Sequence, residues 1–208
     1  MKKLLVILAV ITMVFCYTTI AAANTVYFDY MPDGEFTPET PNSDGVTQFS
    51  LEADIPFEQF KFGFEYLSGT EEYNDGSEDL DWDGYQVDFG YSFVTNDTSN
   101  VAVILGYNSK SFNTDADITG FVLGLDASVE LSKNMLFDFG VAFGLNGEIS
   151  QPGQPDVDTD ILNYKLRFTY LFNENMGASL GYRCDSLDPD DDVKSDIKGF
   201  TLGFVYKF

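Results

Sequence analysis

The sequence has 208 residues, which suits one domain, and 44% of them are hydrophobic, too many for a disordered acidic chain. It carries 34 acidic and 11 basic residues, a formal net charge of -23, and so lacks the basic surface that nucleic-acid binding requires. The chain is rich in Phe, Tyr and Gly, with 20, 12 and 18 residues respectively, and has a single Trp. This composition indicates a β protein with an apolar surface.

The N-terminus has the pattern of a secretory signal peptide. Lys2 and Lys3 are followed by an apolar run over residues 4–15, too short to span a membrane comfortably, and by three alanines at 21–23 that form a cleavage site. An uncleaved anchor helix is the alternative. The sequence therefore predicts a signal peptide over residues 1–23 and a mature domain over residues 24–208. Cys16 would leave with the signal, so Cys184 would have no disulfide partner.

Large apolar residues then recur at every second position, with small or polar residues between them. The clearest example is the segment 135–146, where Met135, Phe137 and Phe139 alternate with Leu136, Asp138 and Gly140. A β-strand has this pattern when one face meets an apolar environment and the other a crowded or polar space. In chain order, the predicted strands cover residues 25–30, 49–55, 60–66, 85–93, 101–107, 121–129, 135–146, 162–170, 176–182 and 200–208.

The connections between these strands alternate in length. Short ones lie around Pro56 and at residues 95–100, 132–134 and 173–175. Longer ones lie at residues 31–45, 69–84, 111–118, 149–159 and 186–197. Short turns at one rim and long loops at the other are typical of outer-membrane barrels, with the short turns in the periplasm. The sequence predicts an all-β fold: a closed antiparallel transmembrane β-barrel of about ten strands, or eight if the N-terminal segments do not pair, with both termini periplasmic.

A soluble β-sandwich or ligand-binding barrel is the competing fold. It would turn the large apolar face inward and the Gly-rich face toward water. Gly63, Gly90 and Gly124 lie on the polar face, where glycine weakens an exposed strand without benefit. The strands also carry more large apolar residues than one sandwich core could hold, whereas in a bilayer all of them can face lipid.

The last nine residues end in an aromatic residue and have apolar or aromatic side chains at alternate positions: Phe200, Leu202, Phe204, Tyr206 and Phe208. This pattern resembles the C-terminal signature of outer-membrane β-barrels, and the chain as a whole is similar to small barrels of the OmpA and OmpX kind. The resemblance implies recognition of this strand by the barrel-assembly machinery, and residence in outer-membrane lipid. It does not fix a function.

The predicted inner face carries charges of both signs: Lys61, Glu65, Asp88, Asp126, Asp138, Lys165, Arg167 and Arg183. A lumen of eight to ten strands is about wide enough for side chains to fill. We therefore expect Lys165, Arg167 and Arg183 to be held by Asp88, Asp126, Asp138 or Glu65, which would plug the lumen. The predicted function is a structural or surface-interaction barrel. The alternative is a narrow cation-preferring pore.

The chain has no His. The outer-membrane enzyme families resemble one another in using an essential His, so we expect neither an enzyme nor a cofactor. Asp79, Asp81 and Asp83 precede Gly84 like the first half of an EF-hand loop, but the residue expected to be Glu is Gly90. These aspartates are a candidate divalent-cation site, and the alternative is that they keep the loop soluble. The nearby Trp82 is expected in an aromatic girdle at the rim.

The cleavage site gives the first testable prediction. The mature protein should begin at Asn24 and fractionate with outer membranes, because the alanines at 21–23 precede it and the chain ends on Phe208. Intact-mass measurement of protein from membrane fractions checks this. An intact Met1, or protein in the soluble periplasm, would contradict it.

Overall fold

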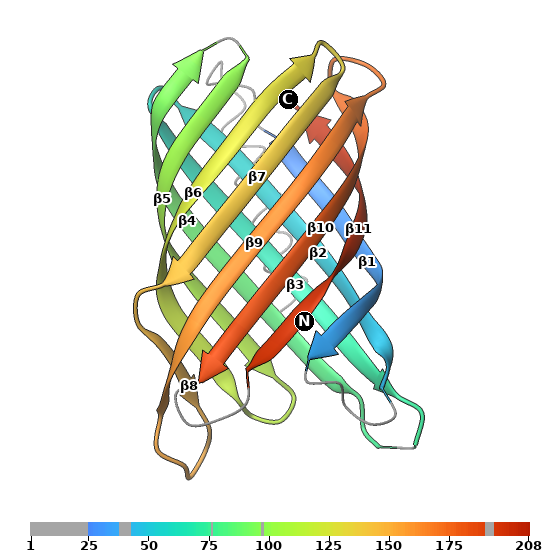
Figure 1. Ribbon diagram of the computed structural model, residues 1–208, viewed down its shortest axis with the longest axis vertical. Coiled ribbons are helices and arrows are strands. Elements are labelled where there is room, and N and C mark those ends of the chain that lie inside the picture. The colour runs from blue at the N-terminus through green and yellow to red at the C-terminus, as the bar shows by residue number, and fades with distance from the viewer. Residues whose placement is uncertain (1–24, 38–42, 76, 97, 190–193) are drawn as a thin grey trace.

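A computed structural model describes residues 25–37, 43–75, 77–96, 98–189 and 194–208. The predicted signal peptide, residues 1–23, and the predicted new N-terminus at Asn24 lie outside these ranges. The described chain forms one closed antiparallel β-barrel, as Figure 1 shows. In these ranges no helix is long and apolar enough to cross a membrane.

Each strand of the barrel is 10 to 17 residues long, apart from one segment of 4 residues. The described strands are β1 (Thr25–Thr37), β2 (Ser43–Phe57), β3 (Phe60–Tyr73), β4 (Leu80–Asn96), β5 (Ser99–Phe112), β6 (Asp117–Ser132), β7 (Met135–Gly144), β8 (Gly147–Ser150), β9 (Val157–Leu171), β10 (Met176–Pro189) and β11 (Ser195–Lys207). β7 and β8 occupy one position in the wall, since each pairs with β6 on one side and β9 on the other. The wall therefore has ten strands, which confirms the preferred count.

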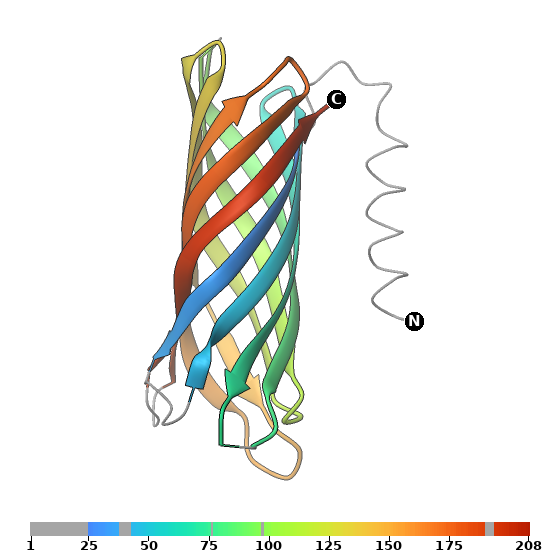
Figure 2. The same cartoon turned by 90° about the vertical axis from the view of Figure 1, so that its right-hand side faces the viewer.

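The barrel closes between its first and last described strands. β1 pairs with β2, and it also pairs with β11 in a register that joins Thr25 to Lys207 and Tyr30 to Leu202. Figure 2 shows β1 and β11 side by side. Closure matters because a membrane offers no water to satisfy an open strand edge. The N-terminal segments do pair, so the eight-stranded alternative does not apply.

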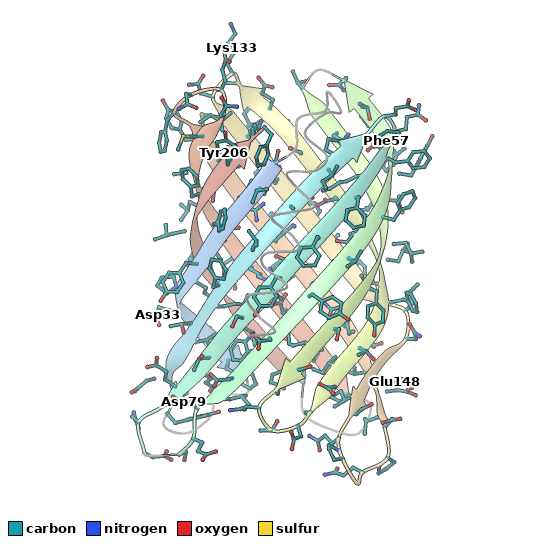
Figure 3. The ribbon with its side chains drawn as sticks, turned by 180° about the vertical axis from the view of Figure 1, so that it is seen from behind. Asp33, Phe57, Asp79, Lys133, Glu148 and Tyr206 are labelled. Carbon is teal, nitrogen blue, oxygen red and sulfur yellow. The ribbon has the colours of Figure 1, made fainter. Side chains whose placement is uncertain are left out.

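Large apolar side chains face outward over the middle of the wall. Phe89 is 57% exposed, and Leu105, Phe121 and Phe168 are exposed to a similar degree. Figure 3 shows such side chains projecting from the back of the barrel. A water-soluble barrel would bury these residues, whereas a bilayer solvates them. The predicted phase of the alternation, with its apolar face outward, is therefore confirmed.

Aromatic rings border this apolar zone at both ends. Toward the long loops, Tyr107 contacts Tyr85 and Phe121, with ring centroids 6.4 and 5.5 Å apart. On the other side of the barrel, Tyr182 contacts Tyr164 and Phe200, at 6.2 and 5.4 Å. Toward the short turns, the outward pairs are Phe60 with Tyr91, Tyr170 with Phe172 and Tyr206 with Phe208. These rings mark the two membrane interfaces.

The alternation reverses beyond the girdle on the long-loop side. Many inward positions there are apolar: Val46, Leu67, Trp82, Ile118, Ile161, Leu187 and Ile197. Outward positions are polar: Asp81, Asp83, Ser109, Asp117, Asp158, Asp160 and Lys198. The strands thus continue past the membrane with the pattern of a soluble barrel. This corrects the predicted long connections at 69–84 and 186–197, much of which is strand.

The prediction that Trp82 lies in the aromatic girdle at the rim was wrong. Trp82 is 2% exposed and points into the barrel, while Tyr85 takes the outward girdle position. Side chains alternate between the two faces of a strand, so Trp82 lies on the same inward face of β4 as Gln86 and Ser92, which are also buried.

The outward phase can be tested at mid-wall. Phe139→Lys should lower the free energy of unfolding by about 2–4 kcal/mol, because it places a charge against lipid. Phe139→Leu, which keeps the side chain apolar, should cost far less. Urea unfolding in lipid vesicles measures both. Comparable losses would show that position 139 does not face lipid.

Candidate functional site

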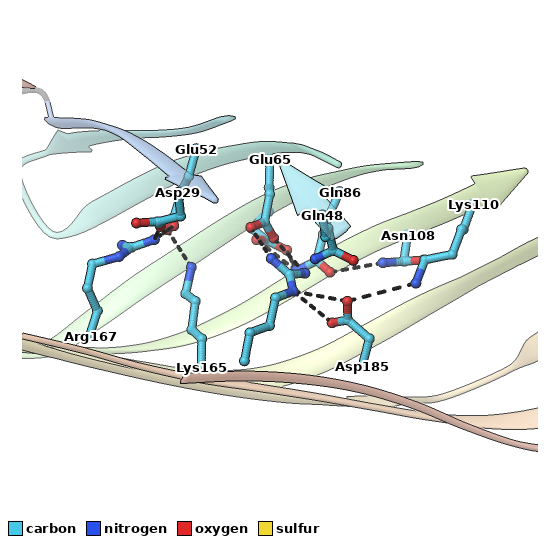
Figure 4. A network of polar contacts seen from close by, with 12 residues as sticks. Asp29, Gln48, Glu52, Glu65, Gln86, Asn108, Lys110, Lys165, Arg167 and Asp185 are labelled. Atoms are coloured by element: carbon cyan, nitrogen blue, oxygen red, sulfur yellow. Dashed lines mark hydrogen bonds and ion pairs between the residues drawn. The ribbon is translucent and has the colours of Figure 1, made fainter. Parts of the chain in front are cut away.

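The lumen is crossed by long basic side chains from β9. Arg167 reaches Asp29 on β1 and Glu52 on β2, at 2.5 and 2.7 Å from its Nη2 atom. Lys165 also contacts Glu52. Figure 4 shows both bases extending from one wall to acids on the facing wall. Arg167, Asp29 and Glu52 are almost fully buried, so each charge offsets the desolvation of the others.

A second group of ion pairs crosses the lumen nearer the long loops. We call each such group a tie. Arg183 on β10 donates to Glu65 on β3 across the lumen and, through Nε, to Asp185 on its own strand at 3.0 Å. Lys110 of β5 lies 3.8 Å from the same Asp185 carboxylate. Above this level, the Asn108 amide donates to Gln86 at 3.2 Å. These contacts fill the middle of the barrel with paired polar groups.

A third tie lies nearer the short turns. Lys61 of β3 is held between Asp54 of β2, at 3.0 Å, and Asp126 of β6. The three ties together connect β9 and β10 to β1, β2 and β3, and β3 to β6. The partners of each ion pair that crosses the lumen, among those described above, lie on strands that are not hydrogen-bonded to each other.

Only part of the predicted pairing matches this geometry. Arg183 meets Glu65, one of the four expected acids, but the partners expected for Lys165 and Arg167 were wrong: both bases take Glu52, and Arg167 also takes Asp29. Asp126 is engaged by Lys61 instead. Asp29 was missed because its strand was judged short and its parity was not followed.

The remaining two predicted lumen acids have neutral partners. Asp88 accepts hydrogen bonds from Gln86 at 3.0 Å. Asp138 accepts one from the Tyr27 hydroxyl at 3.3 Å and one from Ser128. In register, Asp138 lies directly opposite Arg167 on the neighbouring strand, yet the guanidinium extends away from it across the lumen.

Two inward glycines make room for this network. A Cβ atom at Gly106 would lie 2.0 Å from Oδ1 of Asp88, and one at Gly203 would lie 2.0 Å from Oδ1 of Asp29. Real Cβ atoms do not approach that closely, so any larger residue would displace the carboxylates. Glycine at these two positions therefore leaves the space that the two carboxylates occupy.

An apolar cluster closes the barrel at the long-loop end. Trp82 packs with Val46 and Ile197, and half-buried Phe36, Leu80 and Phe112 surround them. The indole lies against Gly69, where a Cβ would come within 2.3 Å of the ring. Its Nε1 atom donates to Gln48 at 3.4 Å. We call the cluster of Trp82, Val46 and Ile197 the apolar cap.

The short-turn end has a looser interior. Tyr27, Leu136, Leu171 and Val205 form a small buried cluster, and the Arg167 guanidinium lies 3.8 Å from the centre of the Tyr27 ring. Beside them is a cavity of about 220 Å³. The cavity at the level of Arg183 measures about 50 Å³, and the one by Lys110 and Ile118 about 10 Å³. The free space therefore tapers toward the apolar cap.

The aspartates proposed as a cation site do not converge. Asp81 and Asp83 face outward on β4, where they accept hydrogen bonds from Thr70 at 2.7 Å and Tyr66 at 2.8 Å. Asp79 precedes the strand and accepts from the Tyr73 amide at 3.2 Å. Over the described ranges, no three His, Cys, Asp or Glu side chains are placed to hold a metal ion. The comparison with an EF-hand therefore has no geometric support.

The predicted assembly strand is β11. Its alternate residues Phe200, Leu202 and Phe204 face outward, and Phe200 is 68% exposed. Tyr206 and Phe208 stack edge to face with centroids 4.7 Å apart. Recognition by the barrel-assembly machinery stays a prediction.

The contribution of a tie to the free energy of unfolding can be compared with that of a surface ion pair. Arg183→Met should lower the free energy of unfolding by about 3–5 kcal/mol, because Glu65 and Asp185 would stay buried without their main counter-charge. Lys198→Met removes a pair with the exposed Glu35 at 3.6 Å and should cost less than about 1 kcal/mol. Urea unfolding followed by Trp82 fluorescence measures both. Equal losses would mean that the buried tie contributes nothing special.

No protein-family model matches this sequence, and no curated protein sequence matches it. Solved structures do. The outer membrane protease OmpT from Escherichia coli superimposes with a TM-score of 0.52 at 7% identity, over 89% of this chain and 93% of that one.

Two other solved structures give lower scores. Neisserial surface protein A has a TM-score of 0.43 at 10% identity, over 89% of this chain and 96% of that one. The Yersinia pestis outer membrane protein Ail has a TM-score of 0.43 at 17% identity, over 89% and 99%. At such identities the likeness concerns the fold, and the fold of this chain is that of bacterial outer-membrane β-barrels.

Proposed function

We propose that this protein is a closed outer-membrane barrel with a structural or surface-interaction role, and that solutes do not pass through it. The observation that carries the proposal is the filled lumen. Buried ties from Arg167, Lys165 and Arg183 cross it, and the apolar cap lies beyond them. An ion entering this interior would have to displace paired charges and then pass the apolar cap around Trp82.

The proposed orientation places the short turns and both termini in the periplasm and the long loops outside the cell. The outward residues beyond the long-loop girdle are mainly acidic, including Asp81, Asp117 and Asp158. Such a surface keeps the loops solvated and presents a strong negative field to external partners. Outer-membrane lipid and, during assembly, the barrel-assembly machinery are the other partners, and divalent cations attracted by the acidic loops are a further candidate.

Enzymatic activity is not part of the proposal. The fold is shared with the protease OmpT, so architecture alone does not decide the matter. The support is chemical: the sequence has no His, and the lumen bases Lys61, Lys110, Lys165, Arg167 and Arg183 are all engaged in ion pairs with buried carboxylates.

One observation favours a narrow cation-preferring pore. Inward acids outnumber inward bases over the described part of the wall. The acids are Asp29, Glu52, Asp54, Glu65, Glu71, Asp88, Asp126, Asp138 and Asp185, and the bases are Lys61, Lys110, Lys165, Arg167 and Arg183. Such an excess would select cations if the lumen opened.

Planar-bilayer conductance of refolded protein distinguishes the two. The wild type should show little steady current. Because the apolar cap is a barrier separate from the ties, Arg167→Ala with Arg183→Ala should raise cation current far less than the same pair combined with Trp82→Ala. Trp82→Ala alone is the matched control and should stay closed.

Steady current through the wild type at the scale of a general porin would overturn the closed barrel and place the pore first. A closed triple variant that still folds would show that the blockage lies elsewhere in the lumen.

A further inference from the structure

The largest described cavity lies inside the barrel at the short-turn end and has a volume of about 220 Å³. Its rim includes Thr25 at the start of β1, Pro56 at the end of β2 and Asn100 at the start of β5. Pro56 and Asn100 are half-buried, so the cavity adjoins the solvent at this rim. A cavity of roughly 150 Å³ can take a molecule the size of benzene, so this one has room for a small organic ligand.

The charge around the cavity is unbalanced toward acid. It is lined by Glu52, Asp54, Asp126 and Asp138 and by three bases, Lys61, Lys165 and Arg167. Lys165 and Arg167 are committed to Glu52, and Arg167 also to Asp29 behind the cavity wall. Lys61 is shared between Asp54 and Asp126. Every base is therefore engaged, and the acids hold the surplus.

The other three lining acids, Glu52, Asp54 and Asp126, are each in contact with a base, so Asp138 is the lining acid that differs. Its side chain is 9% exposed, and the partners found among the described residues are hydroxyl groups, those of Tyr27 and Ser128. No ion pair to Asp138 occurs in the described ranges. The Arg167 charge acts on Asp138 from the neighbouring strand, but the guanidinium is in contact with Asp29 and Glu52. Asp138 is therefore a buried carboxylate whose direct partners are neutral donors, which favours a cation beside it.

The cavity already contains an example of how it holds an ammonium group. The Lys61 amine lies between Asp54 and Asp126, which come from different parts of the wall. β2, which carries Asp54, and β7, which carries Asp138, lie on opposite sides of the ring of strands. Ala127 and Pro56 add apolar lining between the acids. This arrangement suits a short aliphatic chain with an ammonium group better than a bare metal ion, for which no three carboxylates converge among the residues that the structure describes.

We propose that this cavity binds a small aliphatic ammonium compound, such as a short linear diamine, with one ammonium group on Asp138. On the proposed orientation the ligand enters from the periplasm. The site goes beyond the closed-barrel function and does not depend on it, because binding from one rim requires no passage through the apolar cap.

Isothermal titration calorimetry of the refolded protein in nonionic detergent tests the site, with 1,4-diaminobutane as the probe. Saturable binding is expected, and Asp138→Asn should weaken it about 10- to 100-fold, the loss expected for one charge-assisted contact. The matched control is Asp79→Asn, which removes an acid of the same type from an exposed loop and should leave the affinity unchanged. The neutral isostere 1,4-butanediol should not bind.

Several results would overturn the proposal: no saturable binding, equal affinity in the wild type and Asp138→Asn, or a Mg²⁺ titration that reproduces the Asp138-dependent heat. If Asp138→Asn fails to fold, backbone NMR of the wild type decides. Shifts on adding the diamine should then centre on Asp138 and Ser128, and shifts confined to the long loops would refute the site. Conductance is measured separately, so a failed titration leaves the closed barrel standing and a conducting barrel leaves the binding result standing.

Discussion

Complete pairing of the backbone is the constraint on which the rest of this structure depends. Lipid offers no partners for free N–H and C=O groups, so β1 must find β11 and the sheet must close. Closure with ten strands leaves a lumen about as wide as two facing side chains. Charges that point inward then meet one another, and their burial is tolerable only in pairs such as Arg167 with Asp29. The polar interior therefore follows from the closed backbone.

One strand pattern serves two environments. Within the membrane, β4 turns Phe89 and Tyr85 outward and Asp88 inward; beyond the girdle it turns Asp83 outward and Trp82 inward. The register of β4 with β3 and β5 does not shift at this point, so the switch lies in the residue types. The membrane boundary can thus be located on each strand by where the apolar positions change parity. It also explains why an apolar cap lies at the long-loop end although the middle of the lumen is charged.

The sequence was sufficient for the fold because alternation is a local signal. The outward phase of residues such as Phe139 and the inward phase of Asp126 and Arg167 were readable from period two alone. The partners of the lumen charges were not, because they depend on which strands face each other across the ring and on their stagger. Glu52 lies on the inward face of β2, but nothing local shows that it meets both Lys165 and Arg167. Trp82 was misplaced although its parity with Gln86 was visible, because an aromatic residue near a loop suggested a girdle.

The crossing ties also have a consequence for how the chain reaches its native state. Their partners are far apart in the sequence: 113 residues for Lys165 with Glu52, 118 for Arg183 with Glu65 and 138 for Arg167 with Asp29. No hairpin contains both members of such a pair, so a partly inserted sheet would carry these charges into lipid uncompensated. The early and late hairpins must therefore enter the bilayer together, and the order of assembly is set by electrostatics as much as by the growing sheet.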